Sequence, residues 1–146
     1  MWNAISTEDE INNFLDLFGW FHDSCIKEIR YIGGAYVNKD LSMMPINNER
    51  TVDVVFQRQY KNPSTIILRF LGLKTLHLAP CDDNYSCEIY RAFIVSKNGH
   101  FYWTDFENAA NASIEKYDGT WICADKIQWR VIDECIGKEE IFAAKC

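Results

Sequence analysis

The alternation of hydrophobic and polar residues divides the chain into one helical stretch near the N-terminus and a series of strands after it. Within residues 7–18 the apolar side chains recur at the i, i+3, i+4, i+7 spacing of one helix face. These side chains are Ile11, Phe14, Leu15 and Phe18. Thr7 and Glu10 have the spacing of a capping box, and Gly19 stands where a helix commonly stops. The pattern predicts an amphipathic helix over residues 7–18.

From residue 25 onward the apolar positions mostly alternate with polar ones, which is typical of strands with one buried face. The predicted strands are residues 25–37, 52–57, 66–70, 73–79, 87–96, 100–106, 120–124 and 126–132. We expect Gly33-Gly34 to form a bulge or bend, and residues 38–50, with Pro45 and three asparagines, to form a polar loop. Residues 107–119 are polar, with a helical turn expected at 109–112. Residues 138–142 are expected to form a last short strand or helical turn.

Two hairpins are expected between these strands, one closed by residues 61–64 and one by Asn98-Gly99, both of which tolerate positive φ. Short strands joined by tight turns predict an α+β fold. It would be a mainly antiparallel β-sheet, as a curved sheet or a sandwich, with one N-terminal helix packed on it. The length of 146 residues predicts a single domain over residues 1–146. The aromatic content of 14% favours a sheet-rich class, because aromatic residues are enriched in strands.

The net charge of −6 and the scattered basic residues argue against nucleic acid as a partner, because phosphate binding requires a basic patch. The acidic balance fits a dissolved protein, and it would also suit a basic protein partner. The N-terminus has neither the basic nor the apolar region of a signal peptide, and no apolar run approaches the ~20 residues of a membrane span. We therefore expect a cytoplasmic location and no membrane contact.

Six cysteines are present, without any Cys-x-x-Cys spacing. In a reducing cytoplasm we expect all six to remain thiols, and the spacing gives no support for a structural zinc site. The sequence contains no phosphate-binding glycine loop, no metalloprotease motif and no nucleophile elbow. We expect no cofactor, no metal and no identifiable catalytic residue.

The corner Phe21-His22-Asp23-Ser24, followed by Cys25, concentrates polar side chains between the predicted helix and the first strand. It contains the residue types of a nucleophile, a base and an orienting acid, but neighbouring residues of an extended chain face opposite sides and do not converge. We therefore expect His22 and Asp23 to support the fold. We expect Asp23 to accept hydrogen bonds from nearby backbone N–H groups. His22 is expected to be at least half buried, with a ring nitrogen bonded to the main chain or a carboxylate.

Four further residues are candidates for a binding or structural site: His100, Trp103, Asp105 and Trp121. A histidine and a carboxylate on neighbouring strands could bind a metal or a substrate only if they converge. Exposed tryptophans could stack on a sugar ring or anchor a protein partner, whereas buried tryptophans would belong to the core. The high aromatic content of the chain favours the core interpretation.

The order of a short N-terminal helix, Phe21-His22-Asp23-Ser24 and then successive strands resembles small uncharacterised bacterial proteins with a Phe-His-Asp-Ser/Ala corner. Some of these resemble immunity proteins of contact-dependent or polymorphic toxin systems. The resemblance implies a cytoplasmic, non-enzymatic protein that binds another protein. It supplies no catalytic residue, and its His-Asp pair falls on His22 and Asp23.

The preferred hypothesis is a non-catalytic protein-binding domain of immunity-protein type, which uses a sheet face or an acidic loop. The alternative is a small ligand-binding protein or enzyme with a pocket on the aromatic sheet near Trp103 and His100. A deep pocket that unites His22 or His100 with an acid would favour the alternative. A shallow surface with aromatic or acidic patches would favour protein binding. A homodimer is compatible with either hypothesis.

Overall fold

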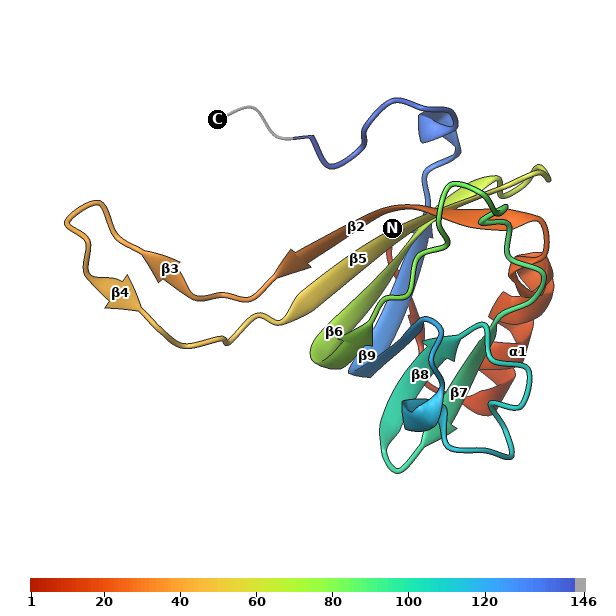
Figure 1. Ribbon diagram of the computed structural model, residues 1–146, viewed down its shortest axis with the longest axis horizontal. Coiled ribbons are helices and arrows are strands. Elements are labelled where there is room, and N and C mark those ends of the chain that lie inside the picture. The colour runs from red at the N-terminus through yellow and green to blue at the C-terminus, as the bar shows by residue number, and fades with distance from the viewer. Residues whose placement is uncertain (144–146) are drawn as a thin grey trace.

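A curved, seven-stranded antiparallel sheet with the helix α1 (Glu8–Leu17) against one face dominates the computed structural model, which describes residues 1–143 (Figure 1). Its strands are β1 (Asn3–Ile5), β2 (Ser24–Ile32), β5 (Thr51–Arg58), β6 (Thr65–His77), β7 (Phe93–Lys97), β8 (His100–Thr104) and β9 (Trp121–Val131). They lie in the order β2-β5-β6-β9-β8-β7, and β1 pairs with β9. The predicted α+β class, with a mainly antiparallel sheet and an N-terminal helix packed on it, is confirmed.

The smaller elements are the strands β3 (Tyr36–Val37) and β4 (Met43–Met44) and the short 3₁₀ helices η1 (Gly19–Phe21), η2 (Ile114–Lys116) and η3 (Asp133–Cys135). β3 and β4 pair only with each other. Within residues 1–143, no helix has the length and apolar character needed to cross a membrane.

The predicted helix forms with the predicted cap. The Thr7 side chain accepts a hydrogen bond from the Glu10 backbone at 3.2 Å, and the Glu10 carboxylate accepts one from the Thr7 backbone at 3.1 Å. Both bonds satisfy N–H groups that have no partner inside the helix. The apolar face is buried against the sheet, with Phe14 3% exposed. Gly19 follows with φ +60°, a conformation that glycine adopts without steric cost.

The β5–β6 hairpin forms the centre of the core. Its inward side chains are Val52, Val54, Phe56, Ile66, Leu68 and Phe70, and each of them is fully buried. Val54 pairs with Leu68 and Phe56 pairs with Ile66 in the antiparallel register. The alternation predicted for these two strands and their pairing are therefore both present. The second predicted hairpin, β7–β8 around Asn98-Gly99, is also present.

Two pairs of predicted strands are single bent strands in the structure. Residues 66–70 and most of 73–79 belong to β6, which ends at His77. Residues 120–124 and 126–132 belong to β9 except for the first and the last residue. The interruption in the sequence pattern at Gly72 marks a bend within a paired strand, and the register shifts just beyond it. Gly72 has φ +66°, and a Cβ there would lie 2.6 Å from an Asp125 carboxylate oxygen. The bend curves the sheet without ending the strand.

Several other predicted boundaries differ from those of the structure. β2 stops at Ile32, before the two glycines, and the expected loop 38–50 contains β4. Of the predicted strand 87–96, only the part from Phe93 onward is β7, and the earlier part makes one isolated bridge. The helical turn expected at 109–112 is present as a single turn, in which the Ala112 N–H donates to the Asn108 carbonyl at 2.9 Å, and η2 follows it. Residues 138–142 form neither a strand nor a helical turn.

The chain after β9 lies on the outer face of the sheet, opposite α1. There Glu28 of β2 accepts hydrogen bonds from the backbone of Ile141 at 2.8 Å and of Phe142 at 3.0 Å. The same face holds Asp53, which is 1% exposed and bonded to Arg69 at 2.7 Å and Arg30 at 3.0 Å. Two arginines compensate the burial of this carboxylate, which would otherwise be costly.

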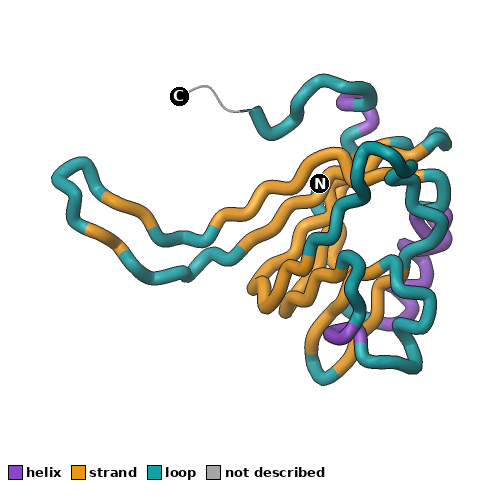
Figure 2. The backbone as a smooth tube through the Cα atoms, in the orientation of Figure 1, coloured by secondary structure: helices purple, strands orange, loops and turns teal. Residues whose placement is uncertain are grey.

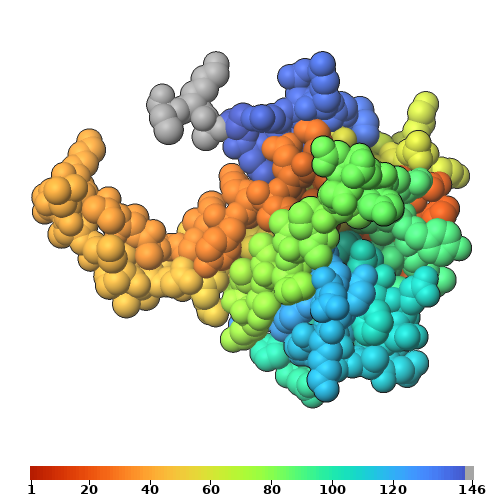
Figure 3. Space-filling model, viewed as in Figure 1, coloured from red at the N-terminus to blue at the C-terminus, as the bar shows by residue number. Residues whose placement is uncertain are grey.

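A narrow arm extends from the sheet between β2 and β5 (Figures 2 and 3). We define the arm as residues 33–49, which include β3 and β4. At its base, the backbone N–H groups of Glu49 and Arg50 donate to the Gly33 carbonyl, each at 2.9 Å. The remainder of the arm projects away from the body of the molecule.

Candidate functional site

The corner between α1 and β2 is a tight turn that inserts Phe21 into the core. Trp20, Phe21 and Asp23 all have positive φ values, between 55° and 61°. Such a conformation is unfavourable for large side chains and persists only when surrounding contacts compensate. Phe21 makes these compensating contacts, since it is fully buried and packs edge-to-face on two rings. The distance between ring centroids is 4.7 Å to Phe56 and 5.7 Å to Trp103. The corner therefore has a clear role in the fold.

His22 lies on the surface of this corner. Its ring Nδ1 is 2.8 Å from the Tyr90 carbonyl oxygen, and its Nε2 is 3.4 Å from the Asp23 carboxylate. The expected hydrogen bond of a ring nitrogen to the main chain is thus present, and the Asp23 carboxylate lies within ion-pair distance. The expected burial was wrong, because 55% of the His22 side chain is exposed. Phe21 occupies the inward position at this turn, so the next residue points outward.

Asp23 contributes to the corner through its backbone. Its N–H donates to the Ile89 carbonyl at 3.1 Å, and its carbonyl accepts from the Gln59 N–H at 3.0 Å. The expectation that its carboxylate accepts backbone hydrogen bonds was wrong, because His22 is the carboxylate's only side-chain or backbone partner among the described residues. The positive φ of Asp23 explains the residue type, since aspartate tolerates this conformation better than most residues.

The other four predicted residues do not gather into one site. Trp103 and Asp105 of the β8 region line one pocket of ≈ 370 Å³, which lies between β2 and residues 78–81. His100 lies at the start of β8, with its Nδ1 3.1 Å from the Asp125 carboxylate. Trp121 is buried in a separate cluster with Tyr102. The structure thus pairs Trp103 with Asp105, and His22 with Asp23, but does not join the two pairs.

Among the described residues, no hydrogen bond or ion pair joins two histidines. His77 bonds to the Gly119 carbonyl at 2.6 Å, whereas His22 and His100 have the partners given above. Within residues 1–143, no three histidine, cysteine, aspartate or glutamate side chains are placed to hold a metal ion. The Tyr102 hydroxyl donates to Glu115, and this bond together with burial raises the pKa of Tyr102 above its ordinary value. The bond links β8 to η2.

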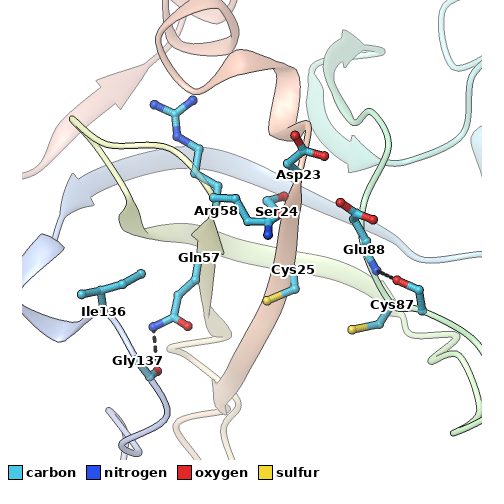
Figure 4. Close-up of a pocket in the computed structure, with 11 residues that line it drawn as sticks. Asp23, Ser24, Cys25, Gln57, Arg58, Cys87, Glu88, Ile136 and Gly137 are labelled. Carbon is cyan, nitrogen blue, oxygen red and sulfur yellow. Dashed lines mark hydrogen bonds between the residues drawn. The ribbon is translucent and has the colours of Figure 1, made fainter.

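A more open cleft of ≈ 500 Å³ lies beside the corner, between the start of β2 and residues 86–88 (Figure 4). Its lining residues are Asp23, Ser24, Cys25, Gln57, Arg58, Gln59, Ser86, Cys87, Glu88, Ile136 and Gly137. Two of these, Cys25 and Cys87, come from segments far apart in the sequence. In this view the Cys25 sulfur points to the left, whereas Cys87 lies to the right of β2.

The charged and amide groups of this cleft are largely engaged elsewhere. The Arg58 guanidinium points away from the two cysteines (Figure 4) and donates to the Pro63 carbonyl at 2.7 Å. The Gln57 amide donates to the Gly137 carbonyl at 3.0 Å. Burial, followed by the nearby Cys87 thiol, raises the pKa of Cys25 above its ordinary value.

The arm presents the largest group of exposed apolar side chains. On the arm and the adjoining end of β2 these are Tyr31, Ile32, Tyr36, Val37, Leu41, Met43 and Ile46. Leu41 at the tip is 84% exposed and Met43 is 65% exposed. Between residues 35 and 48 the arm carries only two charged residues, Lys39 and Asp40, which cancel. An apolar, uncharged surface of this kind is typical of a contact with another protein.

The sequence reasoning missed this surface because Pro45 and the asparagines of residues 38–50 were interpreted as a polar loop. The six large apolar residues from position 36 to position 46 were the available signal. The proximity of Cys25 and Cys87 had no such signal, since 61 residues separate them in the chain. No protein-family model, curated protein or solved structure matches the chain. The geometry of its own residues therefore carries the functional argument.

Proposed function

We propose that this chain is a cytoplasmic, non-catalytic protein-binding domain and that the arm is its main contact surface. The observation that carries the proposal is the exposure of the apolar side chains on a projecting hairpin. An exposed apolar group on a dissolved protein is unfavourable unless a partner covers it. The resemblance at Phe21-His22-Asp23-Ser24 suggests a binding domain of the immunity-protein type.

The composition of the arm supports this proposal. Tyrosine and methionine are enriched in protein interfaces, and charged residues are depleted from their centres. The arm has both properties, with Tyr36, Met43 and Met44 in its two short strands. By contrast, residues 78–88 carry the acidic side chains Asp82, Asp83 and Glu88 on an exposed surface. This acidic segment would steer a basic partner, and the arm would supply the apolar contact.

Photo-crosslinking in living cells tests the proposal directly. A photoreactive amino acid at Val37, which is 54% exposed, should produce a discrete adduct with a partner protein. The matched control is the same amino acid at Tyr60, which is 72% exposed but lies outside the arm. An adduct of twice the mass of this chain would identify a homodimer as the partner. Adducts from position 60 and none from position 37 would contradict the assignment of the arm.

A second test uses substitution of the arm. Replacing Tyr36 and Met43 by serine should abolish the adduct formed through Val37 while the melting temperature stays within about 2 °C, since both side chains are more than half exposed. Replacing Tyr60 by serine should leave the adduct intact. A loss of folding in the arm variant would show that the arm stabilises the body, against the proposal.

The pocket between β2 and residues 78–81 favours a second candidate function, the binding of a small, mainly apolar molecule. Its volume of ≈ 370 Å³ lies within the usual range for ligand sites. Trp103 and Asp105 would supply an aromatic wall and a carboxylate, as the alternative hypothesis requires. The hydrophobic dye anilinonaphthalene sulfonate should bind saturably and quench tryptophan emission if this candidate is correct. Dye binding without saturation would contradict this second candidate function.

A further inference from the structure

We propose that the pocket between β2 and residues 78–81 holds a small apolar molecule by a group that accepts one hydrogen bond and donates another, as a primary carboxamide does. Trp103 would donate to this group, and Asp105 would accept from it. The inference rests on the second candidate function, the binding of a small apolar molecule, and adds the chemical class of that molecule. It does not depend on the arm or on a protein partner.

The indole N–H of Trp103 is a buried donor without a partner. The side chain is 1% exposed, and its nitrogen makes no hydrogen bond within residues 1–143. Buried polar groups are normally paired, because an unmade hydrogen bond is costly. The Trp103 ring packs on Phe21 and Phe56, at centroid distances of 5.7 Å and 5.2 Å, and it also lines the pocket. The two phenylalanines carry no oxygen or nitrogen acceptor, so a ligand in the pocket would supply the missing one.

Asp105 supplies the complementary acceptor in the same pocket. It follows Trp103 by two residues, directly after β8, and side chains two residues apart on an extended chain point to the same face. Its Oδ1 accepts from the Tyr117 hydroxyl at 2.7 Å, whereas its other oxygen has no partner among the described residues. Burial, followed by the bond to Asp105, raises the pKa of Tyr117. The hydroxyl therefore stays protonated and orients the carboxylate.

The remaining wall of the pocket is mainly apolar and is fixed by backbone contacts. The Ala79 N–H donates to the Thr120 hydroxyl at 3.0 Å, and Ile89 pairs with Ser24 at the start of β2. These contacts anchor both ends of the segment that forms one side of the pocket. The apolar residues of the wall are Ile26, Ile29, Leu78, Ala79, Pro80 and Ile89. The body of the ligand should accordingly be apolar.

The two polar groups select against a ligand charge of either sign. A carboxylate would accept from Trp103 but would be repelled by Asp105. An ammonium group would pair with Asp105 but would leave the Trp103 N–H without an acceptor. Lys27 also lines the pocket, but its ammonium is bonded to Glu28 at 2.9 Å. A carboxamide satisfies both groups, because its carbonyl accepts and its NH₂ donates.

Four probes that share a phenyl ring test the inference: benzamide, benzylamine, benzoate and toluene. Benzamide carries an acceptor and a donor, benzylamine as its ammonium ion carries only donors, benzoate carries only acceptors, and toluene carries neither. In NMR titrations of the full chain, the dissociation constant of benzamide should lie about 10-fold or more below that of toluene, as expected for two added hydrogen bonds. Benzylamine and benzoate should each bind more weakly than benzamide.

The Trp103 indole N–H signal gives a second, local measurement. Nuclear Overhauser contacts of its ring with Phe21 and Phe56 identify the signal, so no substitution in the core is required. Benzamide should move this signal downfield, because the N–H proton gains a hydrogen bond to oxygen. Toluene and benzylamine should move it less.

A matched pair of substitutions tests the role of Asp105. Asp105→Asn should reduce the preference for benzamide over benzoate by about 10-fold, because the repulsive charge is removed. Asp118→Asn is the control, since it removes the same charge at an exposed position outside the pocket and should leave the preference unchanged.

The outcomes separate this inference from the candidate function on which it rests. Saturable binding of the probes without a preference for benzamide would overturn the inference and leave the ligand-binding candidate in place. Benzamide binding without a shift of the Trp103 signal would also overturn it. If none of the four probes binds saturably, both the inference and the ligand-binding candidate are contradicted.

Discussion

The β5–β6 and β3–β4 hairpins show opposite uses of the same antiparallel pairing. In β5–β6 the inward side chains are fully buried, and α1 packs against the same face of the sheet. In β3–β4 only two residues of each strand pair, and Tyr36, Val37 and Met43 are all more than half exposed. Apolar residues thus stabilise the first hairpin through burial, whereas in the second they remain available for a partner. Substitutions should therefore affect folding in one hairpin and binding in the other.

The largest expected difference is between Phe56→Ala and Tyr36→Ala. Phe56 is fully buried between Phe21 and Trp103, so its truncation should lower the free energy of unfolding by about 3–5 kcal/mol. At roughly 2–4 °C per kcal/mol, the melting temperature should fall by roughly 6–20 °C. Tyr36→Ala, on the arm, should change the free energy of unfolding by less than about 0.5 kcal/mol. Equal losses in thermal denaturation would remove the distinction between the hairpins.

Two glycines provide the next comparison. Gly72→Ala in β6 requires a side chain at φ +66° and close to Asp125, so we expect a loss of about 2–4 kcal/mol in chemical denaturation. Gly33→Ala at the base of the arm meets the end of the flexible Asn47 side chain and has an ordinary φ, so its cost should be below about 1 kcal/mol. Adding Asp125→Ala to Gly72→Ala should recover part of the loss. Without any recovery, the backbone conformation alone would account for the cost.

At the corner between α1 and β2 we expect a smaller change in stability, caused by the positive φ of Asp23. Asp23→Ala should lower the free energy of unfolding by about 1–2 kcal/mol, because alanine is unfavourable at φ +57°. Asp23→Gly, which removes the same carboxylate, should be close to neutral or stabilising. Thermal denaturation of both variants separates the two causes. Equal losses would restore a role for the carboxylate.

The smallest expected effect is a pH-dependent release of the C-terminal segment from the outer face. Burial raises the pKa of Glu28, but hydrogen bonds from Phe142, Ile141 and Lys27 outweigh it and lower the pKa below the ordinary value. A lowered folded pKa stabilises the attached state above the ordinary pKa, and this stabilisation is lost as the pH falls through the lowered value. The protection factors of the Ile141 and Phe142 amides against hydrogen exchange should decrease on acidification through that range. In Glu28→Gln this pH-dependent decrease should disappear, and its persistence would assign the effect to another group.

The sequence was sufficient where the structure depends on local periodicity. The cap at Thr7 and Glu10, the alternation of Val52, Val54 and Phe56, and the Asn98-Gly99 turn were all predictable, because neighbouring residues determine them. The sequence also identified Trp103 as a core candidate and the corner as a structural element. It could not give the orientation of His22, because burial at that turn depends on which neighbour, Phe21 or His22, meets Phe56 and Trp103.

Tertiary structure alone decided the features on which the functional proposals rest. The strand pattern did not show that β2 would leave the sheet at Ile32 and return at Thr51, so the apolar residues between them were not recognised as an exposed arm. Nor could spacing show that Cys25 and Cys87 line one cleft, because 61 residues separate them in the chain. Periodicity determines which side of an element is apolar. Whether that side is covered depends on contacts between segments distant in the chain.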